Sequence, residues 1–116
     1  MALTWLEHKG RKILFADFRA MTEEQMVAQL HQELALLKQQ TSKVLVLADV
    51  TSAPTGTLFM GVAKELGPEM APFREREAIL GIDGLKSMLL RVFNRVSGGS
   101  MQPFDNAALA KDYLVG

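Results

Sequence analysis

The stretch from residue 43 to residue 66 constrains the fold most, because a short apolar run there leads into a polar loop and then an apolar helix. The run from Val44 to Ala48 contains only apolar side chains and ends at Asp49. Such an uninterrupted run is typical of a strand buried on both faces of a sheet. Open α/β sheets usually place their binding surface where a loop leads from such a strand to a helix. We therefore expect a central strand over 43–49, with a candidate site after it.

The first third of the chain carries hairpin and helix signals. Segments 3–8 and 11–17 are β-prone and are separated by Lys9-Gly10, which predicts a tight hairpin. Thr22 and Gln25 have the spacing of a capping box, which predicts a helix start. The apolar side of that helix has residues at helical spacing, namely Met26, Leu30, Leu34 and Leu37.

Helix and strand signals also alternate after the central strand. We expect a helix over 58–66 that ends at Gly67-Pro68, and an exposed charged segment over 73–77 that leads into a strand over 78–82. Asp83-Gly84 should begin a third helix that Gly98-Gly99 ends, with apolar residues Leu85, Met88, Leu89, Val92, Phe93 and Val96. An edge strand over 101–104 and a last helix capped by Asp105 complete the pattern. The order ββαβαβαβα predicts one α/β domain over residues 1–116, with a mixed, mostly parallel sheet and packed helices.

Composition excludes several function classes. Thirteen basic and thirteen acidic residues give no net charge, whereas nucleic-acid binders normally carry a basic excess. With no cysteine, the chain has no thiolate nucleophile or cysteine-ligated zinc. His8 and His31 lack partners at metal-ligand spacing, and no Gly-x-Ser-x-Gly elbow is present. We expect no enzyme activity, cofactor or metal, and a cytoplasmic location, because no signal peptide or membrane-spanning run is present.

The hydroxyl-rich loop after the central strand has two interpretations. Its residues could simply form turns, with Thr57 as the cap of the next helix. Alternatively, hydroxyls at a helix amino terminus could carry phosphate or bind an anion. The candidate regulatory or partner-binding residues are Asp49, Thr51, Ser52, Thr55 and Thr57. A second candidate anion site would need Arg91 and Arg95 to converge with Arg74 or Arg76.

The methionines also allow two interpretations. Met60, Met70, Met88 and Met101 could fill the core or could form an adaptable apolar binding surface. A candidate site for an apolar ligand combines residues of the second and third helices, namely Phe59, Met60, Val62, Met88, Leu89 and Phe93.

Nearly the whole chain resembles the SpoIIAA-like family, which is also described as STAS/SEC14-like and is related to the anti-sigma-factor antagonists. The resemblance rests on Leu47-Ala48-Asp49-Val50-Thr51, Gly81-Ile82-Asp83-Gly84-Leu85-Lys86 and Phe93-Asn94-Arg95-Val96-Ser97-Gly98. It implies a STAS-like fold that works by binding. In the antagonists, a serine in an Asp-Ser-Ser-Gly-like motif is phosphorylated by a partner kinase. The corresponding stretch here departs from that motif and consists of Ala53-Pro54-Thr55-Gly56-Thr57.

Two functions follow as expectations. The first is a non-catalytic regulatory or protein-interaction module that works through the loop after the central strand. The alternative is a carrier or sensor of a small apolar ligand or lipid, as the SEC14-like resemblance implies. A 116-residue monomer has little room for a large cavity, so a homodimer could enclose one between its subunits.

Overall fold

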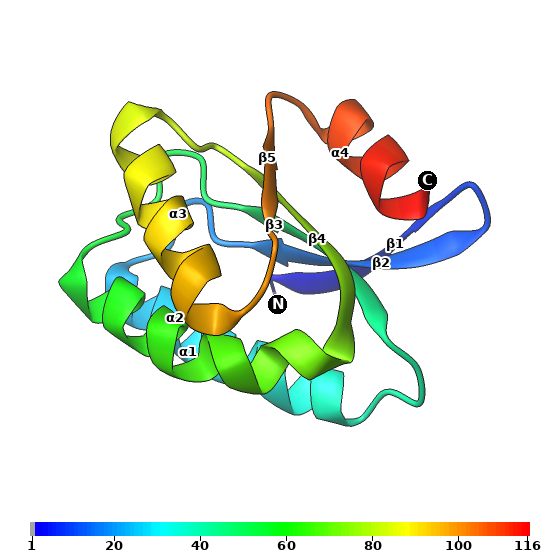
Figure 1. The fold of residues 1–116 in the computed structure, drawn as a ribbon, viewed down its shortest axis with the longest axis horizontal. Coiled ribbons are helices and arrows are strands. Elements are labelled where there is room, and N and C mark those ends of the chain that lie inside the picture. Colours follow the sequence, from blue (N-terminus) through cyan, green and yellow to red (C-terminus); the bar gives the residue numbers. More distant parts are fainter. Residues whose placement is uncertain (1) are drawn as a thin grey trace.

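Five strands form one mixed sheet in the order β1-β2-β3-β4-β5, and four α-helices pack against it (Figure 1). The computed structural model describes residues 2–116, except for the side chain of Leu85. The elements are β1 (Leu3–His8), β2 (Arg11–Asp17), α1 (Glu23–Lys38), β3 (Val44–Asp49), α2 (Thr57–Met70), the 3-10 helix η1 (Ala71–Phe73), β4 (Arg74–Leu80), α3 (Gly84–Ser97), β5 (Gln102–Phe104) and α4 (Ala107–Val115). The predicted order ββαβαβαβα is confirmed.

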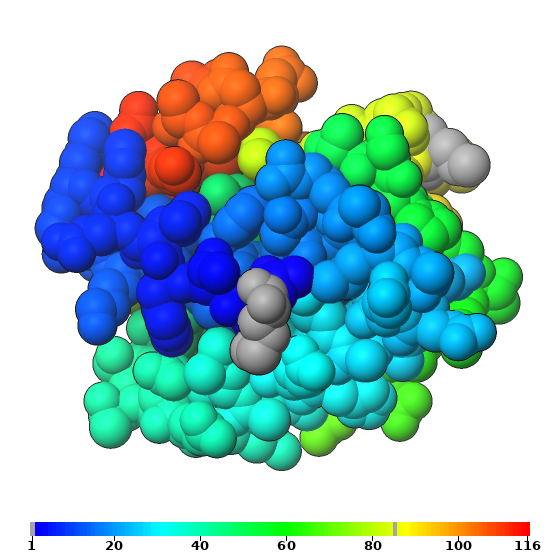
Figure 2. All heavy atoms as spheres, turned by 180° about the vertical axis from the view of Figure 1, so that it is seen from behind, coloured from blue at the N-terminus to red at the C-terminus, as the bar shows by residue number. Residues whose placement is uncertain are grey.

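The connections explain why three helices lie on one side of the sheet. Strands β1 and β2 form an antiparallel hairpin, and β2 to β5 are parallel neighbours in chain order. Right-handed crossovers between successive parallel strands place every connecting helix on the same face. Helices α1 and α2 cover that face, α3 packs mainly on α2, and α4 covers the other face (Figure 1). Seen from behind, the β1–β2 hairpin (blue) lies beside α4 (red), and α1 (cyan) lies towards the lower edge of the molecule (Figure 2).

The central strand β3 has the predicted burial on both faces. All six of its residues are buried, and its side chains alternate between two apolar clusters. Val46 packs towards α1 and α2, whereas Leu45 and Leu47 pack towards α4. Over residues 2–116, no helix has the length and apolar character needed to cross a membrane.

The start of α1 is also as predicted, since Thr22 Oγ1 accepts from Gln25 N and Gln25 Oε1 accepts from Thr22 N. The cap of the last helix was predicted wrongly. Asn106, not Asp105, caps α4, and its side chain accepts a hydrogen bond from Leu109 N at 2.9 Å. Asp and Asn are both good N-cap residues, so the sequence alone could not show which of these two neighbours caps the helix.

The prediction that Gly67-Pro68 ends the second helix was also wrong. Helix α2 continues to Met70, with Pro68 inside its last turns. A proline there removes one backbone donor without ending the helix. Gly67 instead permits close packing, because a Cβ at this position would lie 2.7 Å from Ser97 Cβ and 3.1 Å from Phe93 Cε1. The glycine therefore allows α3 to approach α2.

Strand β4 begins earlier than the sequence indicated. The segment expected to be an exposed approach is part of the strand, and Arg74 and Glu77 within it are almost fully buried. The register shifts between Val44 and Leu45, which pair with Arg74 and Arg76 respectively, so that Glu75 is an extra residue in the strand. This irregularity breaks the alternation of side chains between the two faces. A regular period-two pattern therefore could not predict where the charged residues point.

Candidate functional site: an apolar cavity beneath α3

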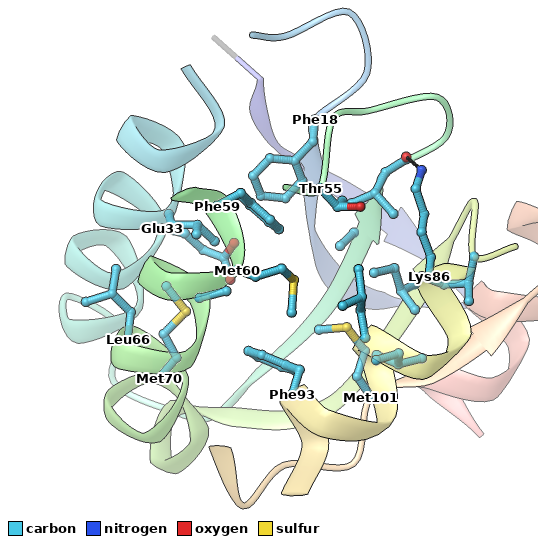
Figure 3. Close-up of a pocket in the computed structure, with 18 of the residues that line it drawn as sticks. Phe18, Glu33, Thr55, Phe59, Met60, Leu66, Met70, Lys86, Phe93 and Met101 are labelled. Atoms are coloured by element: carbon cyan, nitrogen blue, oxygen red, sulfur yellow. Dashed lines mark hydrogen bonds between the residues drawn. The ribbon is translucent and has the colours of Figure 1, made fainter. Parts of the chain in front are cut away.

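A cavity of about 80 Å³ lies between the sheet, α2 and α3, and α1 closes one of its sides (Figure 3). Fifteen of the nineteen residues that line it are apolar, and the other four are Glu33, Thr55, Arg74 and Lys86. The apolar residues are Phe18, Leu30, Ala48, Val50, Phe59, Met60, Ala63, Leu66, Met70, Ile79, Ile82, Leu89, Leu90, Phe93 and Met101. The composition suits an apolar molecule with few polar groups.

Helix α3 covers the cavity and is attached near both ends. At its start, Asp83 Oδ1 accepts a hydrogen bond from Lys86 N at 3.2 Å, and Lys86 Nζ donates to Val50 O at 2.9 Å. Near its end, Asn94 Nδ2 donates to Met101 O and Asn94 Oδ1 accepts from Met101 N, both at 3.0 Å. Between these attachments, Leu89 and Phe93 face the cavity.

Several of the apolar residues named for the third helix lie on the outward side of α3. Met88 is 65% exposed, and Val92 and Val96 are 40% and 49% exposed. The side chain of Leu85 lies outside the described part of the structure. Because α3 packs on only one side, its apolar residues divide between the cavity and the surface.

The structure separates the five predicted loop residues. The carboxylate of Asp49 is buried, where its Oδ1 accepts from Thr51 N at 3.0 Å and from Thr51 Oγ1 at 2.6 Å. Ser52 is exposed with φ of 56°, and Thr57 is exposed at the start of α2. Thr55 lines the cavity instead. The loop is thus built around Asp49, with Ser52 and Thr57 at the surface and Thr55 at the cavity.

A carboxylate from α1 already occupies the amino terminus of α2. Glu23 Oε2 accepts a hydrogen bond from Phe59 N at 2.7 Å, and a Cβ at Gly56 would meet Glu23 Oε1 at 2.9 Å. The prediction that Thr57 caps this helix was therefore wrong, since Gly56 is the N-cap residue and Thr57 is the first helical residue. An acidic side chain suits this place because free amides and the helix dipole favour negative charge.

A buried ionic cluster lies at one side of the cavity. Arg74 donates hydrogen bonds to Glu33 and to Glu77, and all three side chains are at most 7% exposed. Burial alone would lower the pKa of Arg74, but the charges of Glu33 and Glu77 raise it above its ordinary value. Among the described residues, Arg74 Nε has no hydrogen-bond partner. Glu33 lies on the buried side of α1, seven residues after Met26, and Arg74 makes its burial tolerable.

The four arginines considered as an anion site do not converge. Arg74 belongs to the buried cluster on the α1 and α2 side of the sheet. Arg76 points to the α4 side, where it donates to Tyr113 O at 2.7 Å and lies over the Tyr113 ring. Arg91 and Arg95 are exposed on α3. The register shift in β4 is what sends Arg74 and Arg76 to opposite faces.

Of the six residues predicted to line an apolar site, Phe59, Met60, Leu89 and Phe93 line the cavity (Figure 3). Val62 packs at the edge of the main core, and Met88 points to the surface. The sequence did not indicate that Lys86, Arg74 and Glu33 line the cavity. A lysine after the Asp83 cap and an arginine before a strand are each too common to indicate a cavity. The described residues hold no cluster of three or more His, Cys, Asp or Glu side chains that could bind a metal ion.

Comparisons of the chain with family models, with curated proteins and with solved structures find no match. The resemblance to the SpoIIAA-like family thus stays a prediction. The fold and the cavity define a single α/β domain with a largely apolar cavity between the sheet and two helices.

Proposed function

We propose that this protein binds a small apolar ligand or lipid chain in the cavity beneath α3, and that it acts by binding rather than by catalysis. The observation that supports this proposal is the cavity itself, which is apolar on nearly all sides. Protein interiors are close-packed and contain few voids larger than a water molecule. A hollow of about 80 Å³ lined almost entirely by apolar side chains is therefore a suitable place for an apolar ligand.

The size of the cavity limits what enters without a conformational change. An apolar cavity of about 150 Å³ holds a molecule such as benzene, and the cavity here is about half that volume. A longer chain would need α3 to move outward. Such a movement is favoured by the packing of α3, which contacts mainly α2 and is attached near its ends through Lys86 and Asn94.

The test is the melting temperature of the protein in the presence of alkanes, alcohols and acids of increasing chain length. A ligand that binds only the folded state at 100 times its Kd should stabilise the protein by about 2.7 kcal/mol. Leu89→Trp should fill the cavity and remove the effect. Val92→Trp is the matched control, because Val92 lies on the same helix but is exposed. Melting curves that stay unchanged across the panel would refute the proposal.

A second function, a protein-interaction module, is favoured by a different observation. Thr51, Ser52 and Pro54 are exposed in the loop after β3, and Leu58 at the start of α2 is 49% exposed. An apolar side chain beside exposed polar residues suits a protein contact. Pull-down experiments with the wild type and with Leu58→Glu would test this role, since a partner held through this loop should be lost from the variant. Identical partner lists would argue against it.

A further inference from the structure

Lys86 gives the cavity one cationic group that no carboxylate of the described residues neutralises. It lies in the first turn of α3 and lines the cavity on the same side as Thr55 (Figure 3). An ammonium group has three N–H donors, and Val50 O accepts one of them. The ion pairs among the described residues all involve cations other than Lys86. Lys86 therefore has no carboxylate of these residues within salt-bridge distance.

The opposite side of the cavity carries the reverse charge. There the Glu33, Arg74 and Glu77 cluster combines two carboxylates with one guanidinium, which leaves one formal negative charge. Figure 3 shows Glu33 across the cavity from Lys86, with Met60 between them. An anion would therefore be repelled at the Glu33 side and attracted at the Lys86 side. This distribution of charge would give a bound amphiphile a single orientation.

We infer that the ligand is an amphiphilic carboxylic acid, whose carboxylate pairs with Lys86 and Thr55 while its apolar chain lies against Met60, Leu89 and Phe93. The inference rests on the proposed function and adds the chemical class of the ligand. An ion pair that is also hydrogen-bonded is stronger than a neutral hydrogen bond, above all beside apolar side chains. The carboxylate would take the ammonium donors that Val50 leaves available. A neutral alcohol of the same chain length lacks this interaction.

The experiment compares octanoic acid with 1-octanol by titration calorimetry at neutral pH, using the full chain. The wild type should bind the acid at least about tenfold more tightly than the alcohol. Lys86→Met should remove this preference by weakening the acid alone, and Lys86→Arg should retain most of it. Lys64→Met is the matched control, because Lys64 is an exposed lysine on α2 that does not line the cavity.

The alcohol distinguishes failure of the inference from failure of the proposed function. Equal affinities of the wild type for acid and alcohol, or an equal loss of both in Lys86→Met, would overturn the role of Lys86 and leave the apolar cavity as a binding site. Binding of neither molecule to the wild type would overturn the inference, and melting curves that are also unchanged across the panel of chain lengths would overturn the proposed function as well. If Lys86→Met does not fold, the titration of Lys86→Gln gives the same comparison, since this variant can still donate to Val50 O without a charge.

Discussion

Replacing Arg74 by methionine should destabilise the fold by about 3–5 kcal/mol, because two buried carboxylates would lose the cation that neutralises them. The side chains of Arg74, Glu33 and Glu77 are 6%, 2% and 7% exposed, so water cannot take the place of the guanidinium. Methionine fills much of the same space, which keeps cavity formation a minor part of the loss. For a domain whose total stability is about 5–15 kcal/mol, a loss of this size is a large fraction.

Urea and thermal denaturation at neutral pH provide the assay. The melting temperature of Arg74→Met should fall by roughly 10–20 °C. A variant that also carries Glu33→Gln and Glu77→Gln should recover most of the stability at neutral pH, since a neutral cluster has no buried charge to compensate.

The control for this prediction is Arg91→Met, which removes an exposed arginine from α3 and should change stability by less than about 0.5 kcal/mol. A loss below about 1 kcal/mol in Arg74→Met would refute the reasoning. It would mean that Glu33 and Glu77 reach solvent and that the cluster is not buried.

Three smaller changes test other parts of the structure. Val46→Asp should prevent soluble expression or cooperative unfolding, because Val46 is 1% exposed in the central strand, and a near-normal melting temperature would contradict that position. Glu23→Ala should cost about 1 kcal/mol in urea denaturation, because Phe59 N loses its acceptor at the start of α2, and no loss would mean that water replaces the carboxylate. A side-chain hydrogen bond from Arg19 lowers the pKa of Asp17 below 3.8, so its stabilising contribution is present at neutral pH and lost as pH falls through the lowered value. Asp17→Asn should therefore differ in melting temperature from the wild type at neutral pH and converge with it in strong acid, and a constant difference would exclude this cause.

Features that depend on a few neighbouring residues could be predicted from the sequence. The Lys9-Gly10 hairpin needs residues that adopt positive φ, and both do, at 50° and 77°. The Thr22 capping box needs only a hydroxyl and an amide three residues apart. The continuous apolar run of β3 could arise in a strand only if both faces of the sheet were covered.

Features that depend on distant contacts could not be predicted in the same way. Gly67-Pro68 resembles a helix end, and only the close approach of Phe93 and Ser97 explains the glycine. Glu33 lies on the buried side of α1, and only the contact with Arg74, 41 residues later, explains its charge there. In the cavity, Phe59, Met60, Leu89 and Phe93 could be predicted from their apolar character on two neighbouring helices, although Met88, which has the same character, points to the surface. The polar residues that would select a ligand could not be predicted, because their positions depend on tertiary structure.

The loop after β3 and the cavity are physically connected, so binding at the loop and binding in the cavity need not be separate functions. Lys86 Nζ on α3 donates to Val50 O at the start of that loop, and Thr55 within the loop lines the cavity. A ligand carboxylate bound to Lys86 would share the ammonium group with Val50 O and so change the contact that joins α3 to the loop. A partner bound to the loop would therefore respond to an occupied cavity. If both proposed functions hold, the loop and the cavity are two parts of one site, and a ligand in the cavity controls a contact at the loop.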